Sequence, residues 1–216
     1  KLNFGANNIL GMSDNGTEQT IKNLSLKDIE NYYSNYMTSR DAQVVIVGDV
    51  SQAEILPQLA FLNKLPNKKV SNAKPAAAPP IAKTKIYLVD VPKAAQTEFR
   101  VGNATGLKYD AIGEYYKLGL VNHILGGDFN SRLNINLRED KGYTYGARSA
   151  FTSGKENGDF VFSSGIRADA TDSALVEVLK EMDNYSKNGI QPDELAFLKS
   201  AIGQRDARLY ETPGQK

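Results

Sequence analysis

The chain has 216 residues, which is enough for one large domain or for one domain with part of another. Its 26 basic and 25 acidic side chains leave a net charge of +1, so the charge balance gives no reason to expect nucleic acid or an anionic membrane as a partner. No apolar run approaches the roughly 18 residues that a membrane-spanning helix needs, so no membrane span is predicted.

The first 24 residues contain many Gly and Asn and few periodic apolar positions, which predicts a loop. The sequence starts without an initiator Met or a signal-peptide pattern, so we expect an excised fragment, and any targeting signal would lie in the missing part. Ser25 and Asp28 have the spacing of a capping box that opens a helix. One side of this helix is predicted to be buried, and it consists of Ile29, Tyr32, Tyr33 and Tyr36.

A short apolar run at residues 43–47 predicts a buried strand. Ser51 and Glu54 predict a second capping box and a helix to about residue 63, with a kink or a delayed start caused by Pro57. Residues 66–84 are rich in Pro, Ala and Lys, which predicts an extended linker at a domain boundary. Because residues 1–65 offer a single clear strand, we interpret them as the C-terminal remnant of a preceding domain.

The remaining residues, 85–216, are predicted to form one domain, either complete or truncated at its end. Strands arrive in sequential pairs with helices between them, which favours an α+β fold whose helices pack on one face of an antiparallel or mixed sheet. The predicted strands cover residues 85–89, 96–102, 143–152 and 158–167, and the predicted helices cover 110–125, 129–139, 174–185 and 192 to about 209.

A corner is predicted where the first two helices of this domain meet. Gly126 and Gly127 would end the first helix as a C-cap pair, and Phe129 would begin the second. The segment lacks the Gly-Lys-Ser/Thr ending of a phosphate-binding loop and does not follow a strand, so a structural corner is favoured. On the first helix, Ile112, Tyr116, Leu120, Val121 and Ile124 are expected on one side, and on the second Leu133 and Leu137 have i, i+4 spacing.

The chain contains no cysteine and one histidine, His123. A zinc site of the His-Glu-x-x-His type needs two histidines on one helix face, and a histidine-rich catalytic zinc site needs two or three. The chain cannot build either site alone, so no metal ligand and no cofactor are predicted within it. His123 lies in a helical pattern without a nucleophile elbow nearby, which favours a partly buried, hydrogen-bonded structural histidine over a catalytic one.

Arg138 and Tyr145 are the candidate catalytic residues, at the end of a helix and on the strand that follows. An arginine carries a permanent charge and five planar donors, and a tyrosine hydroxyl is a rigidly held neutral donor. Two such donors can hold a peptide carbonyl or stabilise an oxyanion that develops on it. The structural alternative is that Arg138 pairs with Glu139 or Asp140 at the surface while Tyr145 packs on the sheet.

Two neighbouring motifs carry a family resemblance: Leu-Gly-Gly-Asp-Phe-Asn-Ser-Arg-Leu, and then Leu-Arg-Glu-Asp-Lys-Gly-Tyr-Thr-Tyr. Together they resemble the C-terminal-domain signature of the M16 zinc metallopeptidases, the family of insulinase, pitrilysin and mitochondrial processing peptidase. The Val-Val-Ile-Val-Gly-Asp-Val run, the Pro-rich linker and the Gly-Ile-Gln-Pro-Asp-Glu-Leu segment are also similar to the family and occur in the same order.

The resemblance implies repeated α/β domains that close as two halves around a chamber. One domain would carry zinc on an inverted His-x-x-Glu-His motif, which this chain lacks. A facing domain would supply an Arg and a Tyr that hold the substrate backbone, and these match Arg138 and Tyr145. Gly126, Gly127 and Phe129 match a loop that handles substrate in mitochondrial relatives.

The leading hypothesis is therefore the substrate-binding C-terminal portion of a zinc-dependent metalloendopeptidase. The partners would be a peptide or protein substrate, held by addition to a sheet edge, and a zinc-bearing M16 domain of the same chain or of another subunit. The resemblance also suggests a periplasmic or cell-envelope location, with the cytoplasm as the other option. The alternative hypothesis is a non-catalytic, peptidase-like subunit that binds or assembles a partner.

Overall fold

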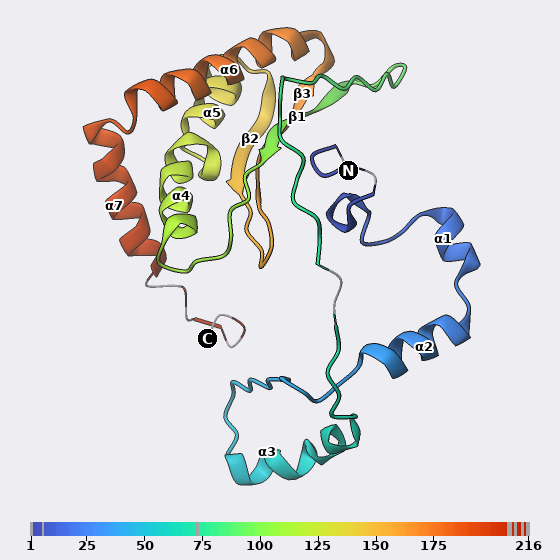
Figure 1. Cartoon of the computed structure of the whole chain (residues 1–216). Helices are drawn as coiled ribbons and strands as arrows, with labels where there is room; N and C mark the ends of the chain where they lie inside the picture. Colours follow the sequence, from blue (N-terminus) through green and yellow to red (C-terminus); the bar gives the residue numbers. More distant parts are fainter. Residues whose placement is uncertain are drawn as a thin grey trace. The chain divides into compact units, whose positions relative to one another are not determined.

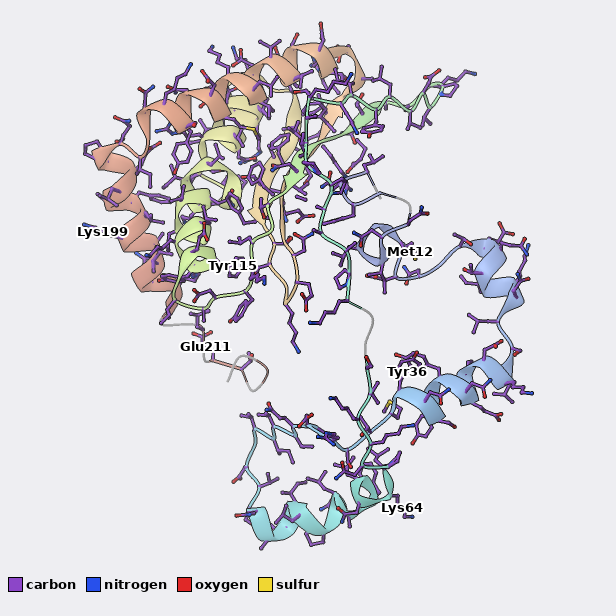
Figure 2. The ribbon with its side chains drawn as sticks, viewed as in Figure 1. Met12, Tyr36, Lys64, Tyr115, Lys199 and Glu211 are labelled. Atoms are coloured by element: carbon purple, nitrogen blue, oxygen red, sulfur yellow. The ribbon has the colours of Figure 1, made fainter. Side chains whose placement is uncertain are left out.

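A computed structural model of the chain describes residues 2–5, 7–71, 74–206, 209, 211, 212 and 214. The chain divides into two compact units (Figures 1 and 2). The first unit combines residues 1–11 with 75–202, and the second combines residues 12–74 with 203–216. Every candidate site residue belongs to the first unit.

The first unit is built on a three-stranded antiparallel sheet of order β1-β3-β2. Its strands are β1 (Gln96–Ala104), β2 (Thr144–Phe151) and β3 (Asp159–Arg167). Alternate β3 residues, among them Phe162 and Ile166, are fully buried. This alternation leaves one sheet face apolar, and it confirms the α+β prediction with its antiparallel sheet.

The helices of this unit gather on one side of the sheet, as Figure 1 shows. Two of them, α4 and α5, continue without a break into the π-helical segments η3 and η4. Their bounds are α4 (Glu114–Asn122), η3 (His123–Gly127), α5 (Arg132–Asn134), η4 (Ile135–Asp140), α6 (Thr171–Asn188) and α7 (Pro192–Asp206).

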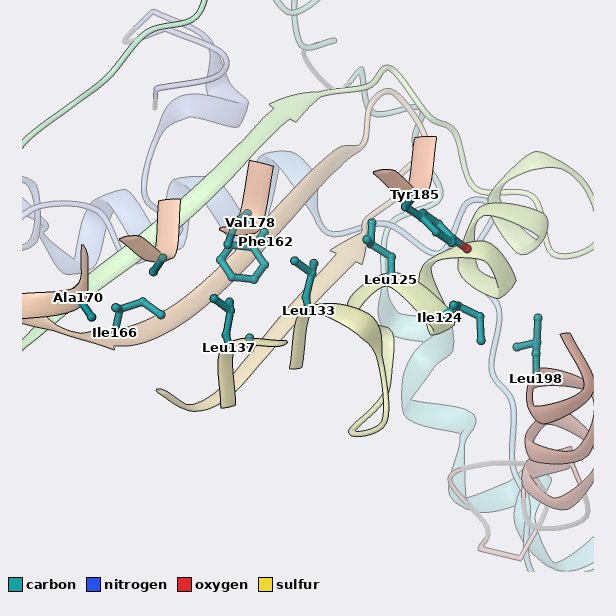
Figure 3. Close-up of a cluster of buried hydrophobic side chains, with 12 residues drawn as sticks. Ile124, Leu125, Leu133, Leu137, Phe162, Ile166, Ala170, Val178, Tyr185 and Leu198 are labelled. Atoms are coloured by element: carbon teal, nitrogen blue, oxygen red, sulfur yellow. The ribbon is translucent and has the colours of Figure 1, made fainter. Parts of the chain in front are cut away.

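The core lies between the sheet and these helices (Figure 3). Leu133 and Leu137 project from α5 and η4 onto Phe162 of β3, and all three side chains are fully buried. Their burial confirms the predicted i, i+4 apolar pair. Burying one side chain of this size contributes about 1.5–3 kcal/mol to the free energy of folding. The contact of Leu133 and Leu137 with Phe162 therefore holds α5 and η4 against the sheet.

The predicted helix over 110–125 begins later than expected. The Asp110 carboxylate accepts N–H bonds from Ile112 and Gly113, which closes a turn before the helix starts. Ile112 therefore lies before the helix and is 86% exposed, so its predicted place on the helix is wrong. Tyr116 and Val121 are also exposed, whereas Leu120 packs on the core and Ile124 is buried in it.

Gly126 and Gly127 lie inside η3 and do not cap α4, so the predicted C-cap pair is wrong. The predicted helix over 129–139 also starts late, at Arg132. The reason is a turn in which the Asp128 carboxylate accepts the N–H of Asn130.

The later elements agree closely with the sequence. The predicted hairpin is confirmed as β2 and β3, and Gly189 ends α6 with a φ of +65° that favours glycine. Helix α7 begins at Pro192, as predicted, and ends at Asp206. The predicted extension to about Leu209 includes residues 207 and 208, which lie outside the described residues, and Leu209 itself is in a turn.

The predicted strand at residues 85–89 is wrong. This segment is irregular, and Ile86 and Leu88 are 75% and 91% exposed. It leads to β1 through a turn in which the N–H of Ala94 donates to the carbonyl of Val91. An alternating sequence needs a neighbouring strand to become a ladder, and no described residue provides one here.

The second unit contains α1 (Glu18–Asn23), α2 (Leu26–Tyr36), α3 (Gln52–Gln58) and the 3-10 helix η2 (Ala60–Lys64). Both predicted capping boxes are confirmed at the starts of α2 and α3. Pro57 lies inside α3, which ends one residue later and does not start late. The predicted loop over residues 1–24 is wrong at α1, because Thr17 and Thr20 form a third capping box there.

Two apolar predictions for this unit are wrong. The run at 43–47 forms no strand, and its four apolar residues are 41–82% exposed. The predicted buried side of α2 is 46–63% exposed. The sequence pattern marks these residues as apolar surfaces, but no described layer covers them.

The division between the units, at Lys74 and Pro75, falls within the predicted linker over 66–84. The described part of that range forms no helix or strand, and residues 72 and 73 lie outside the described residues. The assignment of residues 1–65 and 85–216 to two family domains remains a prediction.

Candidate functional site

Tyr145 lies in a bulge at the start of β2. Thr144 pairs with Ile166 and Ala147 pairs with Ser164, so β2 uses one residue more than β3 over this step. The bulge is held by hydroxyl groups, since Thr144 Oγ1 donates to Gly165 O at 2.8 Å. Tyr145 is 91% exposed, which rules out the sheet-packing alternative for its side chain. Bulges reorient side chains in this way beside functional sites.

Arg138 lies on η4, and its side chain is about one-third exposed, at 32%. Its guanidinium carbon lies 4.2 Å from the centroid of the Phe129 ring, a cation–π contact. Its Nη1 lies 2.9 Å from Glu139 Oε1, so the surface ion pair of the structural alternative does form. The angle of that contact is not one of a hydrogen bond, and Nη1 is buried without a hydrogen-bond partner among the described residues.

The turn between these two residues is closed by the backbone. The N–H of Tyr143 donates to the carbonyl of Leu137 at 2.8 Å, and Gly142 adopts a φ of +63°. Leu137 directly precedes Arg138, and Tyr143 lies two residues before Tyr145, so the bond joins the two backbone segments that carry the candidate donors. The chain therefore fixes the backbone on which both donors are carried.

Asn134 connects the Phe129 loop to β2. It is 3% exposed, its Nδ2 donates to Phe129 O at 2.6 Å, and its Oδ1 accepts the N–H of Ala147 at 2.9 Å. Sequence reasoning missed this residue. The available signal was a short polar side chain beside the buried Leu133, since a buried amide needs partners.

Gly126 and Gly127 let η3 approach β2. A Cβ added to Gly126 would lie 2.8 Å from the backbone nitrogen of Ser149. A Cβ added to Gly127 would lie 2.9 Å from Asn122 Nδ2. Both glycines thus have a packing reason, and their predicted contact with substrate remains a prediction.

The outer edge of β2 is already occupied beside the bulge. Asn134 binds the N–H of Ala147, and Asn122 Nδ2 donates to Ser149 O at 2.8 Å. A peptide held by Arg138 and Tyr145 therefore cannot add to β2 at these two groups. The other edge of the sheet is β1, and the N–H of Thr105, directly after this strand, donates to the carbonyl of Gly158, directly before β3. Residues of an edge strand alternate between bonding their neighbour and facing outward, so the even-numbered residues of β1 direct their backbone N–H and C=O groups outward.

A second arginine nearby is fully engaged in packing. Arg132 contacts Glu194 through Nε to Oε1 at 2.5 Å and Nη2 to Oε2 at 2.7 Å, and its guanidinium lies 4.7 Å from the Tyr185 ring centroid. The hydrogen bonds from Arg132 hold the pKa of the Glu194 carboxyl below its usual range. Burial raises the pKa of Tyr185 to about 12. This cluster ties α5 to the α6–α7 junction, so Arg132 has a structural role that Arg138 does not share.

His123 is largely buried, and its ring stacks on Phe197 of α7 with centroids 6.1 Å apart. Its Nε2 is 3.7 Å from Asp128 Oδ2 and has no hydrogen-bond partner among the described residues, so the predicted hydrogen bond is wrong for that nitrogen. Within the part of the chain that the structure describes, no three His, Cys, Asp or Glu side chains could hold a metal ion together. The residues present do not fit a zinc site.

A family model described as the peptidase M16 inactive domain matches residues 23–202. The chain belongs to the peptidase M16 family. The match covers most of the chain, including the whole stretch from the Phe129 loop to Tyr145, and it confirms the resemblance to an M16 C-terminal domain. No helix of the described residues is long and apolar enough to cross a membrane.

Two curated relatives are zinc proteases by name. YmxG of Bacillus subtilis, named an uncharacterized zinc protease, is 24% identical over 94% of this chain and 48% of its own length. An uncharacterized zinc protease of Streptomyces coelicolor is 27% identical over 93% of this chain and 44% of its own length. The chain thus spans about half the length of these relatives.

Solved structures agree with this M16 fold. A peptidase M16 inactive domain from Pseudomonas fluorescens has a TM-score of 0.77 at 26% identity, over 88% of this chain and 46% of that one. A protease from Helicobacter pylori has a TM-score of 0.75 at 19% identity, over 93% of this chain and 49% of that one. At the second identity, the likeness concerns the fold alone.

Proposed function

We propose that this chain is the substrate-binding portion of a zinc-dependent metalloendopeptidase and is not catalytic by itself. The single observation that carries the proposal is the donor pair beside the β2 bulge. The Arg138 side chain is about one-third exposed, at 32%, and Tyr145, seven residues later on the other side of the Gly142 turn, is almost fully exposed. Because part of the guanidinium is exposed, it can offer planar N–H donors to an acceptor from outside the chain.

The acceptor that suits this pair is the carbonyl oxygen of a peptide bond. A guanidinium donates to an oxygen whether it is neutral or negative, and a tyrosine hydroxyl is a donor at neutral pH. Donors placed where negative charge develops stabilise a tetrahedral intermediate more than the ground state. The ion pair of Arg138 with Glu139 does not prevent this role, because exposed pairs contribute only about 0–1 kcal/mol and rearrange easily.

The zinc would belong to another domain, either in the same chain or in a partner subunit. This part of the proposal is supported by the zinc protease relatives, whose own length is about twice the part that this chain matches. We also propose a periplasmic or cell-envelope location, which is supported by the family resemblance and by the Pro/Ala/Lys-rich segment over 66–84. Cell fractionation with an antibody against the protein would test the location.

The deciding experiment compares Tyr145→Phe and Arg138→Lys with the unchanged full-length protein. We expect each variant to lower kcat/KM for a quenched fluorescent peptide by about 100- to 1,000-fold, in the range of a lost oxyanion donor. Both changes lie outside the core, so the thermal unfolding temperature should stay the same. An unchanged kcat/KM in both variants would remove the pair from the mechanism. Full-length protein without peptidase activity or bound zinc would instead favour a binding or assembly subunit.

A further inference from the structure

Arg138 does not hold its position alone, because its guanidinium rests on the Phe129 ring. The ring is 62% exposed and comes from a loop, so its own side chain has little packing to fix it. What fixes the loop is its backbone, since Phe129 O accepts the Asn134 amide at 2.6 Å. The position of the Arg138 guanidinium therefore depends on the hydrogen bond that Asn134, four residues earlier in the chain, makes with the Phe129 loop.

The same amide also holds the strand that bears Tyr145. Asn134 Oδ1 accepts the N–H of Ala147 at 2.9 Å, directly after the bulge. Ala147 is buried and its N–H points away from β3, so without this bond it would lack a partner. A side-chain amide holds a donor nitrogen and an acceptor oxygen at a fixed spacing, and here the nitrogen binds the loop beside Arg138 while the oxygen binds the strand that bears Tyr145.

We propose that Asn134 is a positioning residue that sets the distance between Arg138 and Tyr145 by binding the Phe129 loop with its donor and the bulged strand with its acceptor. The inference rests on the proposed function, because it assigns to Asn134 an effect that passes through Arg138. Misplacing a substrate-holding group by about 1 Å can cost on the order of 100-fold in rate, so a loosened loop should be visible in kinetics.

The test uses Asn134→Asp in the full-length protein, in both the unchanged and the Arg138→Ala backgrounds. Aspartate keeps an oxygen for the N–H of Ala147 but has no donor for Phe129 O. Its control is Asn122→Asp. Asn122 is similarly buried and also bonds β2, at Ser149, but among the described residues its side chain makes no hydrogen bond with the Phe129 loop.

We expect Asn134→Asp to lower kcat/KM for the fluorescent peptide by about 10-fold or more when Arg138 is present, and by less than about 2-fold when it is absent. Asn122→Asp should lower thermal stability by a similar amount but show no dependence on Arg138. An equal loss from Asn134→Asp in both backgrounds would mean a purely structural role and would overturn the inference. A full effect of Asn134→Asp with no effect of Arg138→Ala would instead contradict the proposed function.

A second pair of variants applies if Asn134→Asp does not fold. Phe129→Leu leaves the backbone bond to Asn134 in place but removes the ring beneath Arg138, whereas Phe129→Tyr keeps an aromatic face. We expect Phe129→Leu to lower kcat/KM only when Arg138 is present. We expect Phe129→Tyr to keep the kcat/KM of the unchanged protein. Equal activity of both variants and the unchanged protein would show that the loop does not position Arg138.

Discussion

Arg132 and Glu194 are joined by two hydrogen bonds across 62 positions of sequence. A third bond runs from Arg132 Nη2 to Gly189 O at 3.0 Å, so one guanidinium holds both the end of α6 and the start of α7. Each side chain is less than one-quarter exposed, so water screens the pair only partly. The pair therefore makes the α6–α7 junction part of the same body as α5.

The stability of the protein should depend on pH through Glu194. Its pKa is lowered in the fold, mainly by the hydrogen bonds from Arg132, so its contribution is present above the unfolded pKa of about 4.3 and is lost as pH falls through the lower folded pKa. We expect Glu194→Gln to reduce the free energy of unfolding by about 1–3 kcal/mol at pH 7, and by less in acid.

Urea unfolding of both proteins at pH 7 and in acid measures this difference. Glu98→Gln is the control, because Glu98 forms an exposed pair with Arg100 and should change little. A Glu194→Gln effect of the same size at both pH values would contradict the prediction.

Gly126→Ala should destabilise the protein by about 1–3 kcal/mol, because the new methyl group would enter the space of Ser149 and η3 would have to move away from β2. Thermal unfolding measures the loss. The matched control is Gly119→Ala in α4, where a Cβ meets no atom within 4 Å. Since alanine favours a helix by about 1 kcal/mol over glycine, this control should be neutral or stabilising. Equal destabilisation by both variants would argue against the close approach of η3.

Leu133→Ala should cost about 2–5 kcal/mol of unfolding free energy, since Leu133 is fully buried between α5 and the sheet. Chemical denaturation measures it. Leu179→Ala on α6 removes the same atoms from a side chain that is 51% exposed and should cost much less. A small effect at Leu133 would mean that the site collapses around the missing side chain.

Tyr185 should remain protonated at pH values where exposed tyrosines ionise, because burial raises its pKa to about 12. Its hydroxyl donates to Val121 O at 2.7 Å, a bond worth about 0.5–1.5 kcal/mol that Tyr185→Phe removes. Titration of phenolate absorbance at about pH 11, above the usual tyrosine pKa of about 10, should give the same amplitude in both proteins. A smaller amplitude in the variant would show that Tyr185 ionises early.

Much of the first unit could be predicted from local patterns. The hairpin of β2 and β3, the Leu133 and Leu137 pair and the end of α6 at Gly189 depend on alternation, i, i+4 spacing and the conformational freedom of glycine. These signals are local, and the core agrees with them. The positions of Arg138 and Tyr145 on a helix end and the next strand were also predictable.

The strands expected at 43–47 and 85–89 show what such patterns lack. Periodicity identifies an apolar face but not the neighbour that covers it, and in the described residues these faces stay exposed. The bulge at Tyr145 and the amide bonds of Asn134 depend on the register of β2 with β3, and register follows from tertiary pairing rather than from local sequence.

The asparagines of α4 and α5 that bind the outer edge of β2 also affect how the protein behaves at high concentration. An edge strand with free N–H and C=O groups invites pairing with another copy, which is a route to aggregation. Asn122 and Asn134 occupy two of these groups on β2 with groups from the same chain. Association of copies edge to edge through this part of β2 is therefore hindered, and β1 is the other edge strand of the sheet.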